Sequence, residues 1–379
     1  MKNRRKNNTT GQRCDTPPVS VIIPVYNAEK YLGQMLKTVE AQTLKNIEII
    51  CVNDGSTDRS GEILEQFRKQ DGRITCLTQQ NLTAGVARNN GLRIAKGEYV
   101  VFWDADDKFD KRALKLMYEK AKRKKADICV CGVCEFTDEG KTYEADGYLR
   151  RDLLPEKDPF NKNDISGRFF DFASNVLWNK MFRRQFLVEK ELGFQNIRQA
   201  NDTAFVMLSL FLAESVTCLD KKLVYYRVNN KDSLTGRSSD TAFCPFEAYE
   251  YTLREIKKYP DFPKVQKSFR NKTAKGMFRA LNIQTSFEEY AKLYEFLQRE
   301  GIKRLEIDKL EKDEAQEEWI FYDLERIKTM DAGDFLLYKS NERRWDRDQL
   351  KYTLRRVRRK LAVLLWLNEK LKKLKKFTK

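Results

Sequence analysis

Three carboxylates follow a short apolar segment near residue 100 and form the densest group of chemically active side chains in the sequence. Residues 99–103 read Tyr-Val-Val-Phe-Trp, and Asp104, Asp106 and Asp107 come directly after them. Carboxylates this close together raise one another's pKa unless a cation lies among them. The pattern therefore predicts a cation site at the carboxyl end of a strand, where open α/β sheets bind their ligands. The alternative is a polar strand end, in which Asp107 or Asp110 caps a following helix.

Two further polar segments follow predicted strands. The apolar segment 19–24 leads into Tyr26, and the apolar segment 47–52 leads into Asn53 and Asp54. Because the carboxyl ends of parallel strands meet at one edge of a sheet, we expect Tyr26 and Asp54 to lie near the three carboxylates.

These residue types suit a bound nucleotide diphosphate. Asp54 could accept hydrogen bonds from a base or a ribose, and Tyr26 could stack on a ring. Asp104 and Asp106 could hold a divalent cation that bridges a diphosphate, as carboxylate-bound Mg²⁺ does. No Gly-x-Gly-x-x-Gly segment follows the first strand and no Gly-Lys-Ser/Thr loop occurs, which disfavours dinucleotide and P-loop binding.

Apolar segments and helical spacing alternate over the first hundred residues. Predicted strands cover 19–24, 47–52, 73–77 and 98–103, and predicted helices cover 29–42, 58–70 and 83–95. This alternation predicts an α/β fold with a doubly wound, mainly parallel sheet and helices on both faces.

The rest of the chain is less regular. We expect strands near 127–136, 141–148, 216–219 and 223–228, and helices near 174–189 and 201–213. Beyond these, helical spacing continues with modest apolar stripes. The predicted regions are a basic disordered tail over 1–18, an α/β domain over 19–240, a helical region over 241–345 and a basic amphipathic helix over 346–379.

Histidine is absent from all 379 residues. Ser-His-Asp and Cys-His catalysis and His-bearing zinc sites are therefore excluded, and acid–base chemistry must fall to carboxylates, Lys, Tyr or Cys. Cys129, Cys131 and Cys134 alternate as in a strand and lack a clear fourth ligand, so we interpret them as structural cysteines rather than a zinc site. The eight cysteines show no disulfide spacing and no secretory signal opens the chain, which predicts a cytoplasmic setting.

The formal charge of +17 is concentrated at the two ends. Residues 1–13 carry five cations and no acid, and residues 351–379 carry twelve cations against Glu369 alone, which leaves +1 for the residues between them. A near-neutral middle argues against nucleic-acid binding and for an anionic surface contacted by the ends.

The predicted last helix has an apolar face among its many cations. No apolar segment approaches the ~20 residues that span a bilayer. A helix of this kind suits the plane of an anionic membrane, and packing on the protein's own core is the alternative. Its apolar face consists of Leu350, Leu354, Val357, Leu361, Leu364 and Leu371.

Four segments together resemble the serial motifs of family 2 glycosyltransferases with the GT-A fold: Pro24-Val-Tyr-Asn27, Asp54-Gly-Ser-Thr-Asp58, Gly85-Val-Ala-Arg-Asn-Asn-Gly91 and Asp104-Ala-Asp-Asp107. The resemblance covers roughly residues 19–235. It implies transfer of a sugar from a nucleotide-diphosphate donor, usually with inversion and with Mg²⁺ or Mn²⁺. It places Asp104 and Asp106 at the metal, and the nucleotide sugar at Pro24, Val25, Tyr26, Asp54, Arg88, Asp104 and Ala105.

The family supplies its catalytic base from a Glu-Asp pair that opens a later helix. Here Asn201-Asp202 stands in that place, so the resemblance assigns the base to Asp202 and departs from the family at Asn201. The alternative is that Asp202 only caps the helix. On the acceptor side, two segments are similar to family motifs, Trp178-Asn-Lys180 and Tyr225-Tyr-Arg227. The resemblance implies that Trp178, Lys180 and Arg227 contact the acceptor or the diphosphate. The alternative is that Trp178 and Tyr225 are aromatic residues of the core.

The resulting hypothesis is an inverting, metal-dependent glycosyltransferase that acts on a glycan or lipid-linked acceptor in surface polysaccharide biosynthesis. It would be cytoplasmic and peripheral on the inner face of the plasma membrane, docked through residues 346–379, with no nucleic-acid partner. The alternative is a catalytically inactive nucleotide-sugar-binding or scaffold subunit of a glycan assembly complex.

Overall fold

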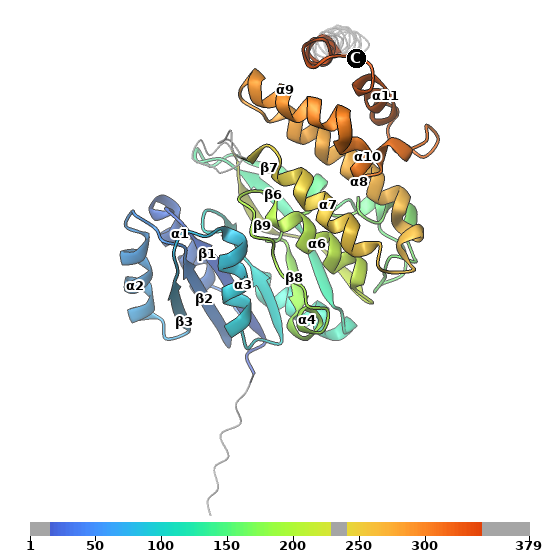
Figure 1. Ribbon diagram of the computed structural model, residues 1–379. Coiled ribbons are helices and arrows are strands. Elements are labelled where there is room, and N and C mark those ends of the chain that lie inside the picture. The colour runs from blue at the N-terminus through green and yellow to red at the C-terminus, as the bar shows by residue number, and fades with distance from the viewer. Residues whose placement is uncertain (1–15, 229–240, 343–379) are drawn as a thin grey trace, which may run out of the picture.

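Four parallel strands form the first half of a single sheet. The computed structural model describes residues 16–228 and 241–342 (Figure 1). Three of the strands carry a run of buried residues, whereas β3 at the edge buries only Ile74, and they lie in the order β3-β2-β1-β4. Their bounds are β1 Val19–Val25, β2 Ile47–Asn53, β3 Ile74–Thr78 and β4 Tyr99–Phe102.

Helices cover both faces of this half because the strands are apolar on both. Ile22, Val100 and Phe102 belong to one buried cluster, whereas Val21 and Val101 belong to the other. On the first face lie α3 (Ala84–Ile94) and α6 (Asn201–Leu212), both in front of the sheet in Figure 1. On the opposite face lie α1 (Glu29–Glu40), α2 (Ser60–Gln70) and α4 (Ala113–Lys124). The predicted doubly wound α/β fold is confirmed.

The second half of the sheet is mixed. β8 (Lys180–Arg183) runs antiparallel between β4 and β6 (Ile128–Phe136). β9 (Val216–Arg227) is parallel to β6 and carries β5 (Lys108–Phe109) on its other side, and β7 (Thr142–Glu144) pairs with β6. The predicted pair of strands at 216–219 and 223–228 is thus one strand, whose register to β6 shifts around Gly132.

The predicted helix over 174–189 is wrong in its first part. Only α5 (Arg184–Glu189) is helical, whereas residues 180–183 form β8. Met181 and Phe182 are fully buried and pair with β4 and β6, so sheet formation overrides the helical spacing. The predicted strand over 141–148 is likewise only β7 followed by a short 3-10 turn, η1 (Asp146–Tyr148). Two more such turns follow, η2 (Arg151–Leu153) and η3 (Ser166–Arg168).

Helices α7 to α11 extend the core that lies on α6. Phe246 of α7 and Phe269 and Phe278 of α8 are buried in the same cluster as Phe205 of α6. Figure 1 shows the later helices stacked away from the parallel strands. Their bounds are α7 Cys244–Ile256, α8 Phe262–Asn282, α9 Phe287–Phe296, the π-helical turn η6 Leu297–Gly301, α10 Ile302–Arg304, the 3-10 turn η7 Ile307–Lys309 and α11 Glu318–Ile327.

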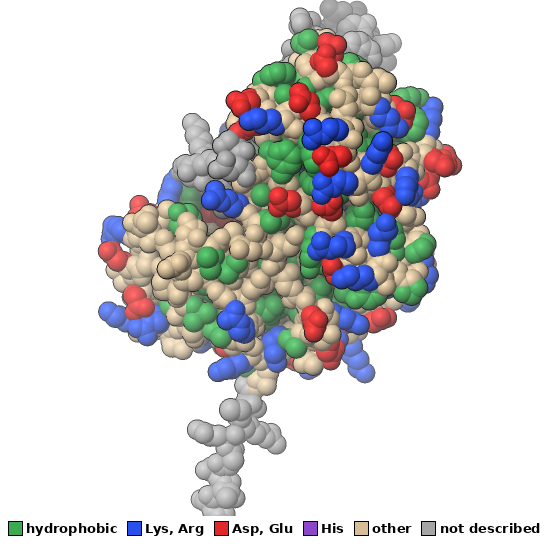
Figure 2. Space-filling model, viewed as in Figure 1, with side chains coloured by type: hydrophobic (Ala, Val, Ile, Leu, Met, Phe, Trp, Pro, Cys, Tyr) green, Lys and Arg blue, Asp and Glu red, His purple; other side chains and the backbone are tan. Residues whose placement is uncertain are grey.

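Charged side chains of both signs are interspersed on the outer surface of these helices, as Figure 2 shows. Within residues 16–228 and 241–342, no helix is long and apolar enough to cross a membrane. The predicted boundary near residue 240 and the predicted amphipathic helix over 346–379 lie outside the described residues, as does the predicted tail over 1–18 except for residues 16–18.

Candidate functional site

The carboxyl ends of β1, β2 and β4 bring the predicted site residues to one edge of the sheet. Val25 pairs with Asn53, and the next backbone N–H, that of Asp54, donates to the Val25 carbonyl at 2.8 Å. On the other side of β1, the Trp103 N–H donates to the Ile22 carbonyl at 3.0 Å. Asp54 and the carboxylates that begin at Asp104 therefore flank the end of β1, as the sequence predicted.

The Asp54 side chain is buried and held by the loop before α3. Its Oδ1 accepts hydrogen bonds from Gln79 Nε2 at 2.7 Å and from the Leu82 N–H at 2.9 Å. The turn after it requires glycine, because Gly55 has a φ of +74° and a Cβ there would lie 2.9 Å from the Asn81 nitrogen. This turn redirects the chain beyond the end of β2, so that Asp54 remains at the strand end.

The segment from Pro24 to Tyr26 offers one side chain to a ligand. Val25 is fully buried in the core, whereas the Tyr26 ring is 43% exposed. Asn27 follows with a φ of 45°, and its Oδ1 accepts the Thr57 N–H at 2.8 Å, which ties the ends of β1 and β2 together. Of the predicted nucleotide contacts in this segment, Val25 is thus limited to its backbone.

The three carboxylates after β4 have different surroundings. Asp104 is partly exposed and forms an ion pair with Arg88 at 2.7 Å. Asp106 is half-buried, and its carbonyl accepts a hydrogen bond from Arg227 Nε at 2.8 Å. Asp107 is buried, and burial together with Asp106 and Asp104 raises its pKa well above the ordinary range of a carboxyl group. The Asp107 side chain faces the protein interior, where its Oδ1 accepts a hydrogen bond from the Arg227 N–H at 2.9 Å. Ala105, which lies between Asp104 and Asp106 in the chain, is buried.

Arg88 connects Asp104 to the helix that carries the predicted base, Asp202. One guanidinium nitrogen contacts Asp104, and the other donates to Asn201 Oδ1 at 2.7 Å. The guanidinium also lies 5.6 Å from the centre of the Phe194 ring, and the side chain is almost fully buried. Arg88 therefore spans the space between β4 and the first residue of α6.

Asp202 follows Asn201 in the first turn of α6 and is half-buried. Burial raises the pKa of its carboxyl group, Asp104 raises it further, and Arg88 opposes both effects. The structure thus brings Asp202 within electrostatic range of the carboxylate cluster although about a hundred residues separate them in the chain. A half-buried carboxylate with a raised pKa is the type of group that accepts a proton near neutral pH.

Lys180 and Arg227 have their donors engaged inside the protein. The Lys180 ammonium is fully buried and donates to the Ser174 and Val176 carbonyls, each at 2.8 Å, and to Asn179 Oδ1 at 2.9 Å. Arg227 contacts Asp138 as an ion pair and lies between the rings of Tyr31 and Phe136. Both side chains orient loops at the site.

Trp178 packs against two tyrosine rings, a contact that the sequence did not predict. Its ring stacks on Tyr226 with 5.0 Å between centroids and contacts Tyr148 at the same distance. Burial raises the pKa of Tyr226 to about 12, and Asp107, Asp106 and Asp104 add to that shift. We define these three rings, Tyr148, Trp178 and Tyr226, as the aromatic platform, which lies beside the carboxylates.

Tyr226 was not among the predicted site residues, although it lies within electrostatic range of the three carboxylates. In the structure, Tyr225 pairs with Lys108 at the edge of the sheet, and Tyr226 points to the other face. The signal that could have identified Tyr226 is its position next to Arg227, at the end of a strand whose side chains alternate between two faces and which ends beside the carboxylates.

The pair Asp104 and Asp106 fits a hard divalent cation. Among the described residues no group of three or more carboxylates, cysteines or histidines could hold a metal ion by itself. Mg²⁺ in phosphate sites is usually held by one or two carboxylates and takes its other ligands from phosphate oxygens and water. Two carboxylates at the edge of the site therefore suit a cation that a bound diphosphate completes.

The glycosyl transferase family 2 model matches residues 20–189. The chain is 30% identical over 239 residues to the GalNAc(5)-diNAcBac-PP-undecaprenol beta-1,3-glucosyltransferase of Campylobacter jejuni. The aligned region covers 62% of this chain and 72% of that protein. It is 31% identical over 214 residues to the glycosyltransferase GlyG of Streptococcus pneumoniae, with 55% of this chain and 70% of that protein covered.

Other relatives are matched over a smaller share of their length. The uncharacterized glycosyltransferase EpsJ of Bacillus subtilis is 36% identical over 225 residues, with 58% of this chain and 63% of that protein covered. The chain thus spans less than two thirds of such relatives. Residues 1–349 of S. aureus TarS, in a crystal structure with UDP-GlcNAc, share the fold with a TM-score of 0.67 at 19% identity, over 86% of this chain and 91% of that one.

Proposed function

Because the chain belongs to glycosyl transferase family 2, we propose that it transfers a sugar from a nucleotide-diphosphate donor to a hydroxyl group of a glycan or lipid-linked acceptor. The observation that carries the proposal is the position of Asp202 beside the Asp104 and Asp106 pair, with Arg88 joining the two sides. Transfer needs a binding site for the diphosphate and a base for the acceptor, and in this proposal these residues would supply both.

The donor side would bind the nucleotide through Tyr26 and Asp54. Tyr26 is exposed enough to stack on a base, and the fixed Asp54 carboxylate accepts hydrogen bonds. Asp104 and Asp106 would hold Mg²⁺ or Mn²⁺, and such a cation would neutralise charge on the leaving diphosphate. Arg88 is engaged with Asp104 and Asn201, so we assign it to positioning the site rather than to the base or phosphates.

The acceptor side would use Asp202 as the general base. A base that removes the hydroxyl proton while the diphosphate leaves from the opposite face of the sugar produces inversion. The raised pKa of Asp202 increases its proton affinity, and the Arg88 cation opposes this rise. The neutral Asn201 in place of the family's Glu leaves Arg88 with Asp104 as its carboxylate partner.

The relatives' names support the reaction class and a role in surface glycan assembly. One acts on an undecaprenol-linked glycan, and another is a poly(ribitol-phosphate) beta-glucosyltransferase of Bacillus spizizenii. Their acceptors differ, so we propose the class of reaction and leave the donor sugar to experiment.

We also propose that the protein acts at the inner face of the plasma membrane. The sequence of residues 346–379, which is cationic and has leucines at helical spacing, supports this location. Deletion of residues 351–379 should release the protein from vesicles that contain anionic lipid, and unchanged co-sedimentation would refute the proposal.

A donor screen tests the proposed reaction. The protein is incubated with nucleotide sugars and Mn²⁺ or Mg²⁺, and release of the nucleoside diphosphate is measured. At least one donor should be hydrolysed or transferred, and Asp106→Asn should abolish this activity. Lack of turnover with every donor, together with lack of nucleoside diphosphate binding, would reject the proposal.

A further inference from the structure

The segment 193–200 connects α5 to α6 and leads directly to Asn201 and Asp202. It is irregular, so the helix and strand ladders that hold regular elements do not fix its course. Its polar backbone groups must find partners elsewhere where they are buried. Several of the contacts that hold this segment come from α3.

Asn89 of α3 binds the backbone of Phe194 through both ends of its side-chain amide. Its Nδ2 donates to the Phe194 carbonyl at 2.8 Å, and its Oδ1 accepts a hydrogen bond from the Phe194 N–H at 2.8 Å. The ring of Phe194 stacks on Phe205 of α6 with 4.0 Å between the centroids. Asn89 therefore fixes a residue that packs on α6 one turn after Asn201.

The segment also passes so close to α3 that a side chain at position 85 would collide with it. A Cβ at Gly85 would lie 2.4 Å from the carbonyl oxygen of Gln195 and 3.2 Å from the Cβ of Asn201. Next to this contact, Thr83 Oγ1 donates to Asn196 Oδ1 at 3.1 Å. The close approach at Gly85 thus brings the start of α6 into direct contact with α3.

The residue before Asn201 is held in a backbone conformation that its type rarely adopts. Ala200 has a φ of 56°, in the left-handed region that favours glycine. Such a conformation persists where the surrounding contacts impose it. Asn201 supplies two of these contacts, because its Oδ1 accepts from Arg88 at 2.7 Å and its Nδ2 donates to the Ile197 carbonyl at 3.4 Å. The start of α6 is therefore set by its contacts rather than by the preference of Ala200.

We propose that Asn89 is a positioning residue for Asp202, because its hold on Phe194 keeps the segment 193–200 against α3 and so sets where the carboxylate lies. The inference rests on the proposed function, in which Asp202 is the base. A base must lie within hydrogen-bond reach of the proton that it removes. A displacement of about 1 Å can therefore slow transfer although the carboxylate itself is intact.

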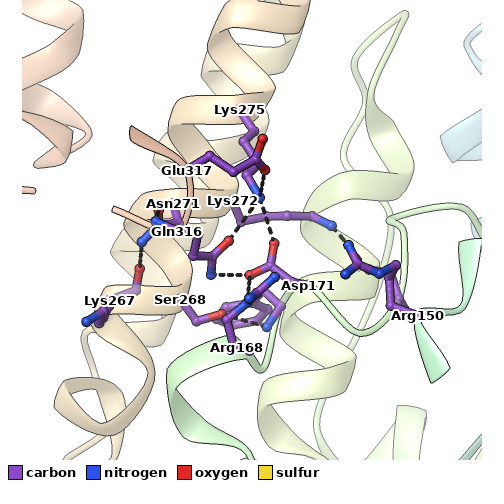
Figure 3. Close-up of polar contacts among 12 residues, drawn as sticks. Arg150, Arg168, Asp171, Lys267, Ser268, Asn271, Lys272, Lys275, Gln316 and Glu317 are labelled. Carbon is purple, nitrogen blue, oxygen red and sulfur yellow. Dashed lines mark hydrogen bonds and ion pairs between the residues drawn. The ribbon is translucent and has the colours of Figure 1, made fainter. Parts of the chain in front are cut away.

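Helix α8 offers a matched control for Asn89. Asn271 Oδ1 accepts the Gln316 N–H at 2.8 Å, and its Nδ2 donates to the Glu314 carbonyl at 3.0 Å. Figure 3 shows Asn271 on α8 with Gln316 beside it. Asn271 thus holds the segment that leads to α11 as Asn89 holds the segment that leads to α6, and none of the candidate site residues belongs to α11.

Steady-state transfer is measured with the donor and acceptor that the wild type uses, and rates are expressed per mole of protein that binds nucleoside diphosphate. Asn89→Ala should lower kcat about tenfold. The affinity for the nucleoside diphosphate and the KM of the donor should stay within about twofold, because the carboxylates after β4 keep their places. Asn271→Ala removes the same type of contact and should leave kcat within about twofold of the wild type.

A double-mutant cycle separates positioning of the base from a general loss of structure. In Asp202→Asn no carboxylate remains to be positioned, so the addition of Asn89→Ala should lower the residual rate by less than about twofold. Gly85→Ala, which would push the segment away from α3, should show the same pattern as Asn89→Ala. Gly33→Ala is its control, since only Phe67 Cε2, at 4.0 Å, lies near a Cβ at that helical position.

Hydrogen exchange tests the structural step without turnover. Backbone amides of residues 194–202 should exchange faster in Asn89→Ala than in the wild type. In Asn271→Ala the faster exchange should fall on residues 314–316 instead, and residues 194–202 should exchange as they do in the wild type.

Three results would overturn the inference and leave the proposed function intact. Asn89→Ala could transfer at the rate of the wild type, it could slow Asp202→Asn by the same factor as it slows the wild type, or it could leave the exchange of residues 194–202 unchanged. Absence of transfer by the wild type with every donor is a different result, because it rejects the proposed function and this inference with it.

Discussion

At the scale of single residues, Arg88 is the side chain that connects the two parts of the candidate site, the carboxylates after β4 and the start of α6. It contacts the donor-side carboxylate Asp104 and, through Asn201, the helix turn that carries Asp202. It also lowers the pKa of Asp202, against the effects of burial and of Asp104. Its role is one of position and charge, since it is buried and already engaged.

Replacement of Arg88 by Gln should slow transfer about 10²-fold and shift its pH profile. Without the guanidinium, the pKa of Asp202 rises, so the limb of the rate profile on which the base ionises should move to higher pH. The rate of transfer is measured between pH 5 and 9, with Arg88→Lys as the variant that keeps the charge. A lower rate with an unshifted profile would show that Arg88 acts only by packing.

Lys180 provides a pH-dependent test of stability. Burial lowers its pKa to about 7, whereas the unfolded chain has the ordinary value near 10.5. Between these values the unfolded state binds more protons than the folded state, so the free energy of unfolding should rise with pH. From pH 7 to pH 9 the wild type should gain on the order of 1–2 kcal/mol relative to Lys180→Met, as measured by urea unfolding. Parallel pH curves for the two proteins would contradict this account.

The sequence identified the carboxylates but not the direction of the longer side chains. Asp54, Asp104, Asp106 and Asp202 lie at strand ends or at a helix start, and their backbone position alone brings them near the site. Lys180 and Arg227 were expected to contact the acceptor or the diphosphate, but Lys180 donates to carbonyls of the loop just before it, and Arg227 contacts Asp106 and Asp138 from distant segments. Such partners could not be predicted from residue type and spacing.

At the scale of elements, the site depends on α3 lying close to β1 and β2. Gly91 of α3 allows this approach, because a Cβ there would lie 2.5 Å from Ile22 Cγ2. The same helix carries Arg88 one turn earlier. The position of α3 on the sheet therefore sets the position of the residue that joins Asp104 to Asn201.

Gly91→Ala should destabilise the protein by about 1–3 kcal/mol, because the added methyl group overpacks the contact between helix and sheet. Gly72→Ala is the matched control, since no heavy atom lies within 4 Å of a Cβ at that position. Urea unfolding of both variants gives the comparison. Equal stability of the two would show that α3 shifts without penalty.

Parallel strands were predicted better than the mixed half of the sheet. β1, β2 and β4 are apolar on both faces, and helices alternate with the first four strands along the chain, so periodicity and chain order agree. β8 has only four residues and lies between two antiparallel neighbours that are distant in sequence. Its pairing is a tertiary effect, which is why the sequence there was interpreted as helical.

At the scale of the whole molecule, the later helices and the α/β sheet share one apolar core. Phe205 of α6 and Phe246, Phe269 and Phe278 of the later helices belong to one buried cluster with Phe102 of β4. Tyr249 of α7, which lies within electrostatic range of Asp202, also comes from these helices. The helices thus complete the site as well as the core.

A chain that ends at residue 240 should lose cooperative unfolding, because the apolar face of α6 would be exposed to water. Thermal unfolding followed by circular dichroism compares this fragment with the full chain. A fragment that unfolds cooperatively at the temperature of the full chain would show that the helices are dispensable for the fold.

The central claim is that Asp202 is the base for a sugar donor seated at Asp104 and Asp106. The most direct measurement is transfer by Asp202→Asn with the donor that the wild type uses, together with calorimetry of the nucleoside diphosphate. The account predicts a loss of transfer of at least about 10²-fold, with affinity for the nucleoside diphosphate unchanged within twofold. Transfer by Asp202→Asn at the rate of the wild type would contradict it.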